Sequence, residues 1–233
     1  MRSDADASTS PDLTVDAPIE ESRWPPVAAL LVYMALNIGI RVWLPSDSPV
    51  RVPWLIPAVE ALLLVVLVFG HPARMATERR RRVRPFVIAL VVLLVAAALW
   101  ATALLVYDLI KGTGVSSSPS ELLASGGLVW LGNNLSFALL YWLVDSGGPV
   151  ARARNPEPVD FAFTQHMSPE LAPRGWRPVF LDYLHLGFTN ATAFSPTDVM
   201  PLTLRAKYTM VVQSTVALAL FGLIVARAVN AFT

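Results

Sequence analysis

Long apolar stretches constrain this chain more than any other feature of its sequence. A helix needs about 20 mostly apolar residues to cross the hydrocarbon core of a bilayer. Stretches of about that length lie at residues 25–44, 53–70, 86–110, 122–144 and 208–232. Charged residues make up 15% of the chain, whereas soluble domains carry about 25%. The sequence therefore predicts an all-α, polytopic membrane helical bundle with five full spans, surrounded by the lipid bilayer.

Composition divides the chain into four regions. Residues 1–24 are acidic, rich in Ser, Thr and Pro, and typical of a disordered tail. Residues 25–144 hold four spans, and residues 145–177 form a polar loop that is too long for a simple turn. Residues 178–233 contain a half-polar apolar segment, a break between two prolines and the final span.

Arginines near the spans predict the orientation. The loop after the second span carries a group of them: Arg74, Arg79, Arg80, Arg81, Arg82 and Arg84. The positive-inside rule places this loop in the cytoplasm, together with the N-terminus and the polar loop at 145–177. We expect a bacterial plasma (inner) membrane protein whose Arg79–Arg84 run contacts anionic lipid headgroups. Nucleic acid is not an expected partner.

The sequence offers little for catalysis or metal binding. There are no cysteines, which excludes disulfides and thiolate metal sites. The acids Asp160 and Glu170 in the polar loop are expected to be solvated. An intramembrane enzyme would need Glu60, His185 and Asp198 to converge, and their spacing does not bring them together. We predict no catalytic residue, no metal, no cofactor and no enzymatic activity, and expect His185 to be a hydrogen-bonded helix-packing residue.

Polar residues inside the first four spans need partners, because hydrocarbon offers none. Glu60 in the second span is expected to pair with Arg41 or Asn37 of the first. A structural clamp is the commoner interpretation of such a pair, and an ion or proton site is the alternative. Asn133 and Asn134 point about 100° apart on their helix. At least one of them should therefore hydrogen-bond to another helix, with pore lining as the alternative.

Small residues recur at spacings of three and four along the final span, at Thr215, Ala219, Gly222 and Ala226. Such a stripe allows helices to approach closely. It indicates helix packing first and a homo-oligomer second.

Short motifs spread over most of the chain after Pro25 resemble a bacterial family of multi-pass membrane proteins of unknown function. They are the arginine-rich loop, Val159-Asp160-Phe161, Asp182-Tyr183-Leu184 before Phe188-Thr189, and Thr197-Asp198-Val199. This resemblance implies a multi-pass membrane protein and brings no established activity.

Residues 182–230 also resemble the pore half of a two-span potassium channel, which consists of a pore helix, a filter and an inner helix. Thr192, Ala193, Phe194, Ser195, Pro196, Thr197 and Asp198 stand where the filter and its following acid lie. The resemblance implies a pore-like constriction at these residues. Ser195 and Thr197 occupy the positions of the two filter glycines, and Pro196 has a fixed φ and no N–H. These departures argue against a potassium-selective carbonyl filter and leave a wider constriction or a closed relic.

Two topologies fit residues 176–194. They could form a short additional crossing, giving six crossings and an internal C-terminus, which Arg227 at the end of the last helix favours. Alternatively, they could enter from the cytoplasm and return, as a pore helix does, leaving the C-terminus outside. The expected function is ion-channel-like or small-solute transport, and the alternative is a non-transporting membrane scaffold or assembly protein.

Overall fold

The computed structural model describes residues 21–43, 55–69, 77–111, 119–154, 159–192 and 198–232. Its elements in chain order are α1 (Trp24–Trp43), α2 (Leu55–Phe69), α3 (Thr77–Lys111), α4 (Pro119–Val144), η1 (Asp145–Gly147), α5 (Pro149–Arg154), β1 (Phe161–Phe163), α6 (Thr164–Met167), η2 (Pro169–Leu171), α7 (Phe180–Thr192), β2 (Val199–Pro201) and α8 (Leu204–Phe232). The prediction of a mostly helical chain is confirmed, and one small sheet is added to it.

Among the described residues, three helices are long and apolar enough to cross a membrane. Their candidate spans are Val83–Tyr107, Leu123–Gly147 and Leu204–Ala226. The described parts of α1 and α2 contain shorter apolar stretches, Trp24–Gly39 and Pro57–Val68. Large apolar side chains such as Trp100 and Phe221 are exposed on the outside of the bundle, as lipid contact requires. These features support a membrane protein.

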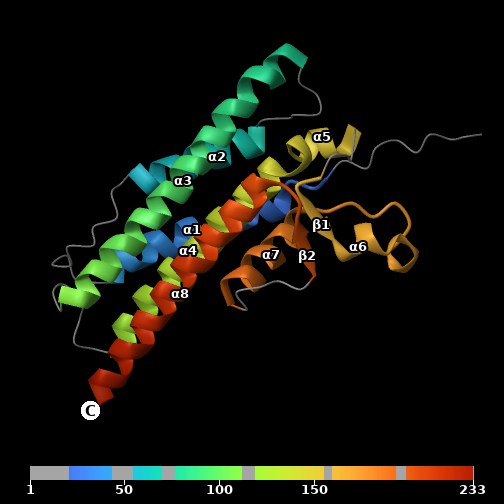
Figure 1. Ribbon diagram of the computed structural model, residues 1–233. Coiled ribbons are helices and arrows are strands. Elements are labelled where there is room, and N and C mark those ends of the chain that lie inside the picture. The colour runs from blue at the N-terminus through green and yellow to red at the C-terminus, as the bar shows by residue number, and fades with distance from the viewer. Residues whose placement is uncertain are drawn as a thin grey trace, which may run out of the picture.

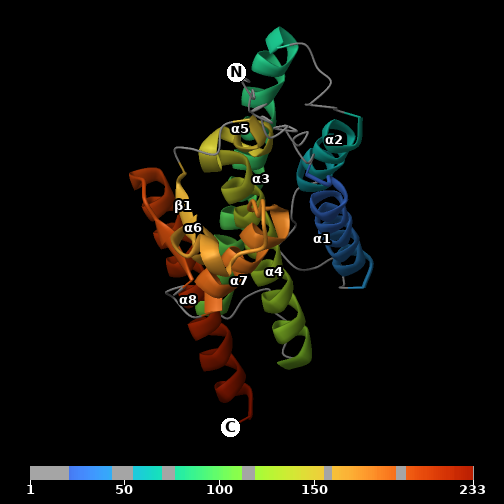
Figure 2. The same ribbon diagram turned by 90° about the vertical axis from the view of Figure 1, so that its right-hand side faces the viewer.

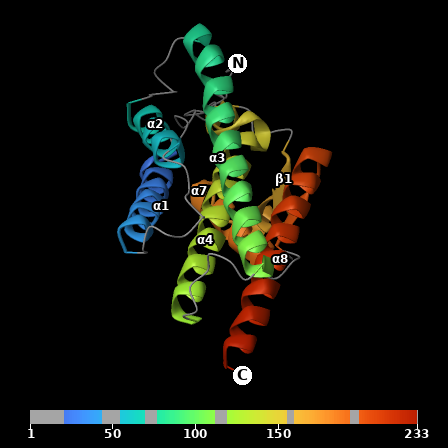
Figure 3. The same ribbon diagram turned by 90° about the vertical axis from the view of Figure 1, so that its left-hand side faces the viewer.

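The long helices form a bundle around α4, which contacts α1, α3, α7 and α8. Figure 3 shows α3 in front, with α1 and α2 on one side of it and α8 on the other. Large side chains of α4, among them Phe137 and Tyr141, are fully buried in the core.

One end of the bundle is covered by the short elements η1, α5, β1, α6, η2 and β2, and we call it the capped end. The guanidinium of Arg23, next to the start of α1, donates to the carbonyl of Val68 at the end of α2 (3.1 Å). Trp142 near the end of α4 donates to Glu21 (2.7 Å). The helices α1 and α8 therefore begin at the end of the bundle where α2 and α4 finish (Figure 1).

The two strands bring together segments that flank α7. β1 pairs antiparallel with β2, with Phe161 opposite Pro201 and Phe163 opposite Val199. Figure 2 shows this sheet with α6 and α7 in front of the bundle, between α8 and the α1–α2 pair. The chain thus leaves β1, forms α7 and returns beside its starting point before α8 begins.

α7 does not run the length of the bundle. Its 13 residues span about 20 Å, because a helix rises 1.5 Å per residue, whereas the hydrocarbon core is about 30 Å thick. The carbonyl of Gly187 accepts a hydrogen bond from Gln213 (2.9 Å), and a Cβ added at Gly187 would lie 3.3 Å from the carbonyl oxygen of Asn134. Asn134 and Gln213 lie near the centres of their candidate spans. Asn190, close to the end of α7, also donates to Gln213, so α7 ends about halfway along the bundle.

The short length of α7 disfavours a full crossing by residues 176–194, and the number of crossings stays a prediction. The alternative, in which the segment enters and returns at the same end, matches the positions of β1, α7 and β2. A hydrophobic pattern alone cannot separate the two cases, because both bury an apolar helix against its neighbours.

Candidate functional site

The inner half of α7 is held by a buried hydrogen-bond network centred on Gln213. Its Oε1 accepts from the Tyr141 hydroxyl (2.7 Å) and from the Asn190 amide (2.8 Å). Its Nε2 donates to the Gly187 carbonyl (2.9 Å) and to Asn134 Oδ1 (3.4 Å). Gln213 is only 1% exposed. One side chain of α8 therefore joins α4 and α7 at mid-depth, and both of its polar atoms are fully used.

The end of α7 lies next to this network, on the outside of the bundle. Ser214 Oγ lies 3.2 Å from the Asn190 carbonyl, to which it donates. Thr192, the last residue of α7, is exposed, and its hydroxyl donates to the carbonyl of Phe188 (2.9 Å). The other expected constriction residues before Asp198, which are Ala193, Phe194, Ser195, Pro196 and Thr197, lie outside the described residues.

His185 and Asp198 form a pair that sequence spacing did not suggest. Nε2 of His185 lies 3.0 Å from Oδ2 of Asp198, with 60% and 37% of these side chains exposed. The carbonyl of Asp198 also accepts from the backbone N–H of Thr164 (3.1 Å), just after β1. His185 thus lies on the outer face of α7 and contacts the returning chain.

The first helical hairpin contains the buried carboxylate of Glu60. Asn37 Nδ2 donates to Glu60 Oε1 across 2.9 Å, and the two residues are 7% and 0% exposed. Of the two expected partners, Asn37 makes this contact, while the side chain of Arg41 lies outside the described residues.

The two adjacent asparagines of α4 face different helices. Asn133 Nδ2 donates to Thr102 Oγ1 of α3 (2.7 Å), and Asn134 accepts from Gln213 of α8. Both asparagines are buried. Each therefore joins α4 to a neighbouring helix.

The small residues Thr215, Ala219, Gly222 and Ala226 are all exposed on α8. A Cβ added at Gly222 would meet no atom within 4 Å. Among the described residues the stripe does not pack against another helix of this chain, so its role in a homo-oligomer stays a prediction.

A buried polar cluster at the capped end was missed by sequence reasoning. Asp145 is fully buried; its Oδ1 accepts from the backbone N–H of Asp160 (2.7 Å) and of Phe161 (3.2 Å), and its Oδ2 from the Tyr183 hydroxyl. The turn that places it has positive φ angles of 78° at Gly147 and 93° at Gly148, which glycine adopts without strain. An acid followed closely by two glycines after an apolar span is the signal that could have indicated this site.

Asp160 is the second buried carboxylate of the cluster, and the expectation that it is solvated is wrong. Arg205 binds it through two hydrogen bonds, of 2.7 Å and 2.6 Å, and the Thr203 hydroxyl donates a third of 2.6 Å. Its side chain is 1% exposed. Burial alone would raise the pKa of Asp160, but the hydrogen bonds from Arg205 and Thr203 outweigh it and lower the pKa below its usual value of 3.8. Glu170 is exposed, as expected.

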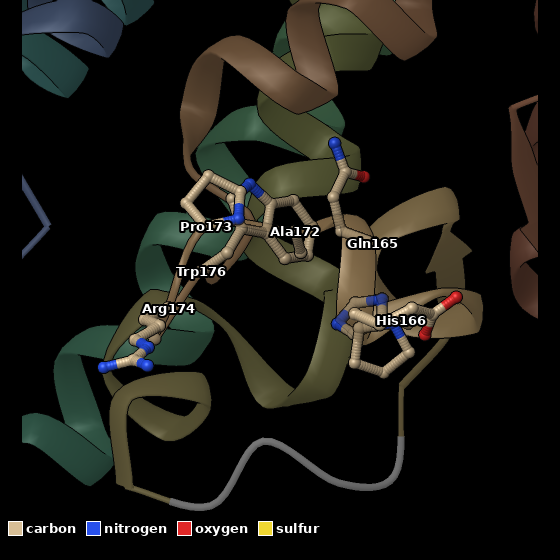
Figure 4. A pocket seen from close by; sticks show the side chains of 9 residues that line it. Gln165, His166, Ala172, Pro173, Arg174 and Trp176 are labelled. Carbon is tan, nitrogen blue, oxygen red and sulfur yellow. The ribbon is translucent and has the colours of Figure 1, made fainter.

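An open hollow of about 500 Å³ lies beside α6, on the outside of the capped end. Figure 4 shows the rings of His166 and Trp176 on its wall, with their centroids 5.2 Å apart. Nδ1 of His166 accepts from the backbone N–H of Phe163, which orients the imidazole. In the part of the chain that the structure describes, no three His, Cys, Asp or Glu residues are grouped to hold a metal ion.

Comparison with known proteins finds no matching family model, no similar curated protein and no similar solved structure.

Proposed function

We propose that this chain is a five-span protein of the bacterial inner membrane that passes small cations or other small polar solutes at the inner end of α7. The observation that carries the proposal is the half-length of α7, which begins at the capped end and stops near the centres of α4 and α8. Half-helices that end at the bilayer midplane are typical of substrate and ion sites in transporters. A helix break at that depth is tolerated where protein or a water-filled cavity surrounds it.

Electrostatics favour a cation at this position. The last carbonyl groups of a helix carry partial negative charge, and those of α7 lie about halfway along the length of the bundle. Thr192 adds a hydroxyl at this end of α7, and Asp198 adds a carboxylate nearer the capped end, where it pairs with His185. Since Thr192 is exposed, we place the passage between copies of the chain, with Thr192 at its narrow part.

The order α4, α7 and α8 supports the resemblance to a channel half. α4 ends at the capped end, α7 enters from it, and α8 begins there and runs back along α4. An outer helix, pore helix and inner helix have the same relation. The arginines near the start of α3 make the capped end cytoplasmic under the positive-inside rule, so this segment enters from the cytoplasm.

The first prediction concerns the C-terminus. With α8 starting at a cytoplasmic capped end and crossing once, the C-terminus should lie outside the cytoplasm. A reporter that works only outside the cytoplasm should therefore be active when fused after Thr233. A reporter that works only in the cytoplasm should be active when fused before Met1. A C-terminal reporter active in the cytoplasm would contradict both the orientation and the single crossing by α8.

The second prediction concerns flux. Purified protein in liposomes should pass small cations, and Asp198→Asn should lower this flux by about tenfold, because a carboxylate at the mouth raises the local cation concentration. Dye-reported uptake of monovalent cations under an imposed gradient measures the effect.

Glu170→Gln provides the matched control, since Glu170 is an exposed acid of the same end that lies outside α7 and the returning chain. It should leave both flux and folding unchanged. Wild-type protein that passes no ion under any gradient or voltage would sink the transport proposal.

A membrane scaffold is the second candidate, and the Gln213 network favours it. Every polar atom of the Gln213 side chain is bonded within the chain, which suits a rigid interior better than a lumen. For a scaffold, Asp198→Asn would alter expression or thermal stability, and neither it nor the wild-type protein would conduct.

A further inference from the structure

The carboxylate of Glu21, just ahead of α1, joins three elements at the capped end. Its Oε1 accepts from the Trp142 indole of α4 (2.7 Å) and from the backbone N–H of Phe180, the first residue of α7 (2.7 Å). Its Oε2 lies 3.6 Å from the guanidinium of Arg152 in α5. The side chain is 15% exposed. Glu21 is therefore placed where the start of α7 meets the bundle.

The start of α7 needs such a contact, because the first N–H groups of a helix have no partner within it. Asp182 satisfies one of them locally, by accepting from the backbone N–H of Val179 (2.7 Å). The N–H of Phe180 is satisfied by Glu21, a residue 159 positions earlier. Both acids also lie favourably at the positive end of the helix dipole. Half of this cap is therefore supplied from outside the α7 region.

Arg152 extends the contact further into α7. It is 4% exposed, and its Nη1 donates to the carbonyls of Trp142 (2.8 Å) and Asp145 (2.9 Å). Its guanidinium lies 4.9 Å from the ring centre of Tyr183, one turn into α7. Glu21 supplies the nearby negative charge for this buried cation. Loss of the Glu21 carboxylate would thus disturb the first turn of α7 at two points.

We infer that Glu21 is a positioning residue for α7, and that its contacts set how far α7 extends along α4 and α8. α7 is a single helix between Phe180 and Thr192, so a displacement of its first turn moves its inner end as well. The position of α7 can be tested without any assumption about function. An effect of Glu21 on flux rests on the proposed transport.

The absence of cysteine from the chain makes the test direct. A single Thr192→Cys change places a thiol on the exposed inner end of α7, and its rate of maleimide labelling is measured in liposomes. Adding Glu21→Ala should change this rate by about fivefold, the factor expected for loss of a helix cap. Glu21→Gln keeps an accepting oxygen for Trp142 and Phe180 and should restore most of the native rate. Ser22→Ala, at the exposed polar residue next along the chain, should leave it unchanged.

A second thiol separates positioning from general unfolding. In a Thr215→Cys background, on the exposed face of α8, Glu21→Ala should not alter labelling. An unchanged rate at Thr192→Cys, or equal changes at both thiols, would overturn the inference. A selective change at Thr192→Cys in a protein that shows no flux would support the positioning role and reject the proposed transport.

Discussion

Replacing Asp160 with alanine is expected to destabilise the protein by roughly 3 kcal/mol, because it removes the buried carboxylate that accepts hydrogen bonds from the start of α8. Arg205 and Thr203 both donate to Asp160. The backbone N–H of Ser146 makes a further hydrogen bond to it, of 3.2 Å. The buried donors lose their acceptor, whereas Arg205 can turn to water since 59% of its side chain is exposed. Thermal unfolding of the purified protein in detergent measures the loss.

The same carboxylate predicts a pH dependence of this stability. Hydrogen bonds lower the pKa of folded Asp160 below the ordinary value of 3.8, although burial opposes them. A lowered acid pKa contributes stability that is fully present above the unfolded pKa and is lost as the pH falls through the folded one. The difference in stability between wild type and Asp160→Ala should therefore be constant near neutral pH and narrow below about pH 4.

Two further variants serve as comparisons for Asp160→Ala. Glu170→Ala removes an exposed acid of the same polar loop and should change the stability by less than about 0.5 kcal/mol. Asp160→Asn keeps an accepting oxygen and loses the charge, so its effect should fall between wild type and Asp160→Ala. A loss below about 0.5 kcal/mol for Asp160→Ala would contradict a structural role for this cluster.

The three long apolar helices found among the described residues could be predicted from sequence, because a bilayer sets a length and a composition that single stretches must meet. The end to which α7 returns could not, since it depends on β1 and β2, whose paired residues Phe161 and Pro201 are 40 positions apart. No local pattern encodes that pairing. The length of α7 could likewise not be predicted, because the apolar residues Pro178 and Val179 extend the hydrophobic segment beyond the start of the helix.

The buried and paired polar residues fall into two groups, according to how far apart in the sequence their partners lie. Glu60 and Asn37 lie on adjacent helices of one hairpin, so the cost of an unpaired group in hydrocarbon was enough to suggest their contact. Asp160 sits in a loop of ordinary polar composition, and its burial follows from α8 and η1 folding over it. The pairing of His185 with Asp198 depends on the return of the chain to the capped end. Sequence reasoning therefore found the polar groups inside spans more readily than those at the cap.

Gln213→Ala is expected to cost roughly 2 to 3 kcal/mol, because four hydrogen bonds between helices are lost at about 0.6 kcal/mol each. The Tyr141 hydroxyl and the Asn190 amide lose an acceptor, and the Gly187 carbonyl loses a donor. These groups are buried, so water does not readily replace the missing partner. Loss of thermal stability in detergent measures the effect.

The matched control for Gln213→Ala is Thr215→Ala, two residues along the same helix on its exposed face, which should be nearly neutral. Because Gln213 joins α7 to α4, its loss should also free the inner half of α7 while β1 and β2 still hold the capped end. Hydrogen exchange should then rise in α7 from Gly187 onwards and stay low at Tyr183, whose hydroxyl is bonded to Asp145. Uniform exchange along α7, or a Gln213→Ala variant as stable as Thr215→Ala, would mean that packing rather than this network fixes α7 at mid-depth.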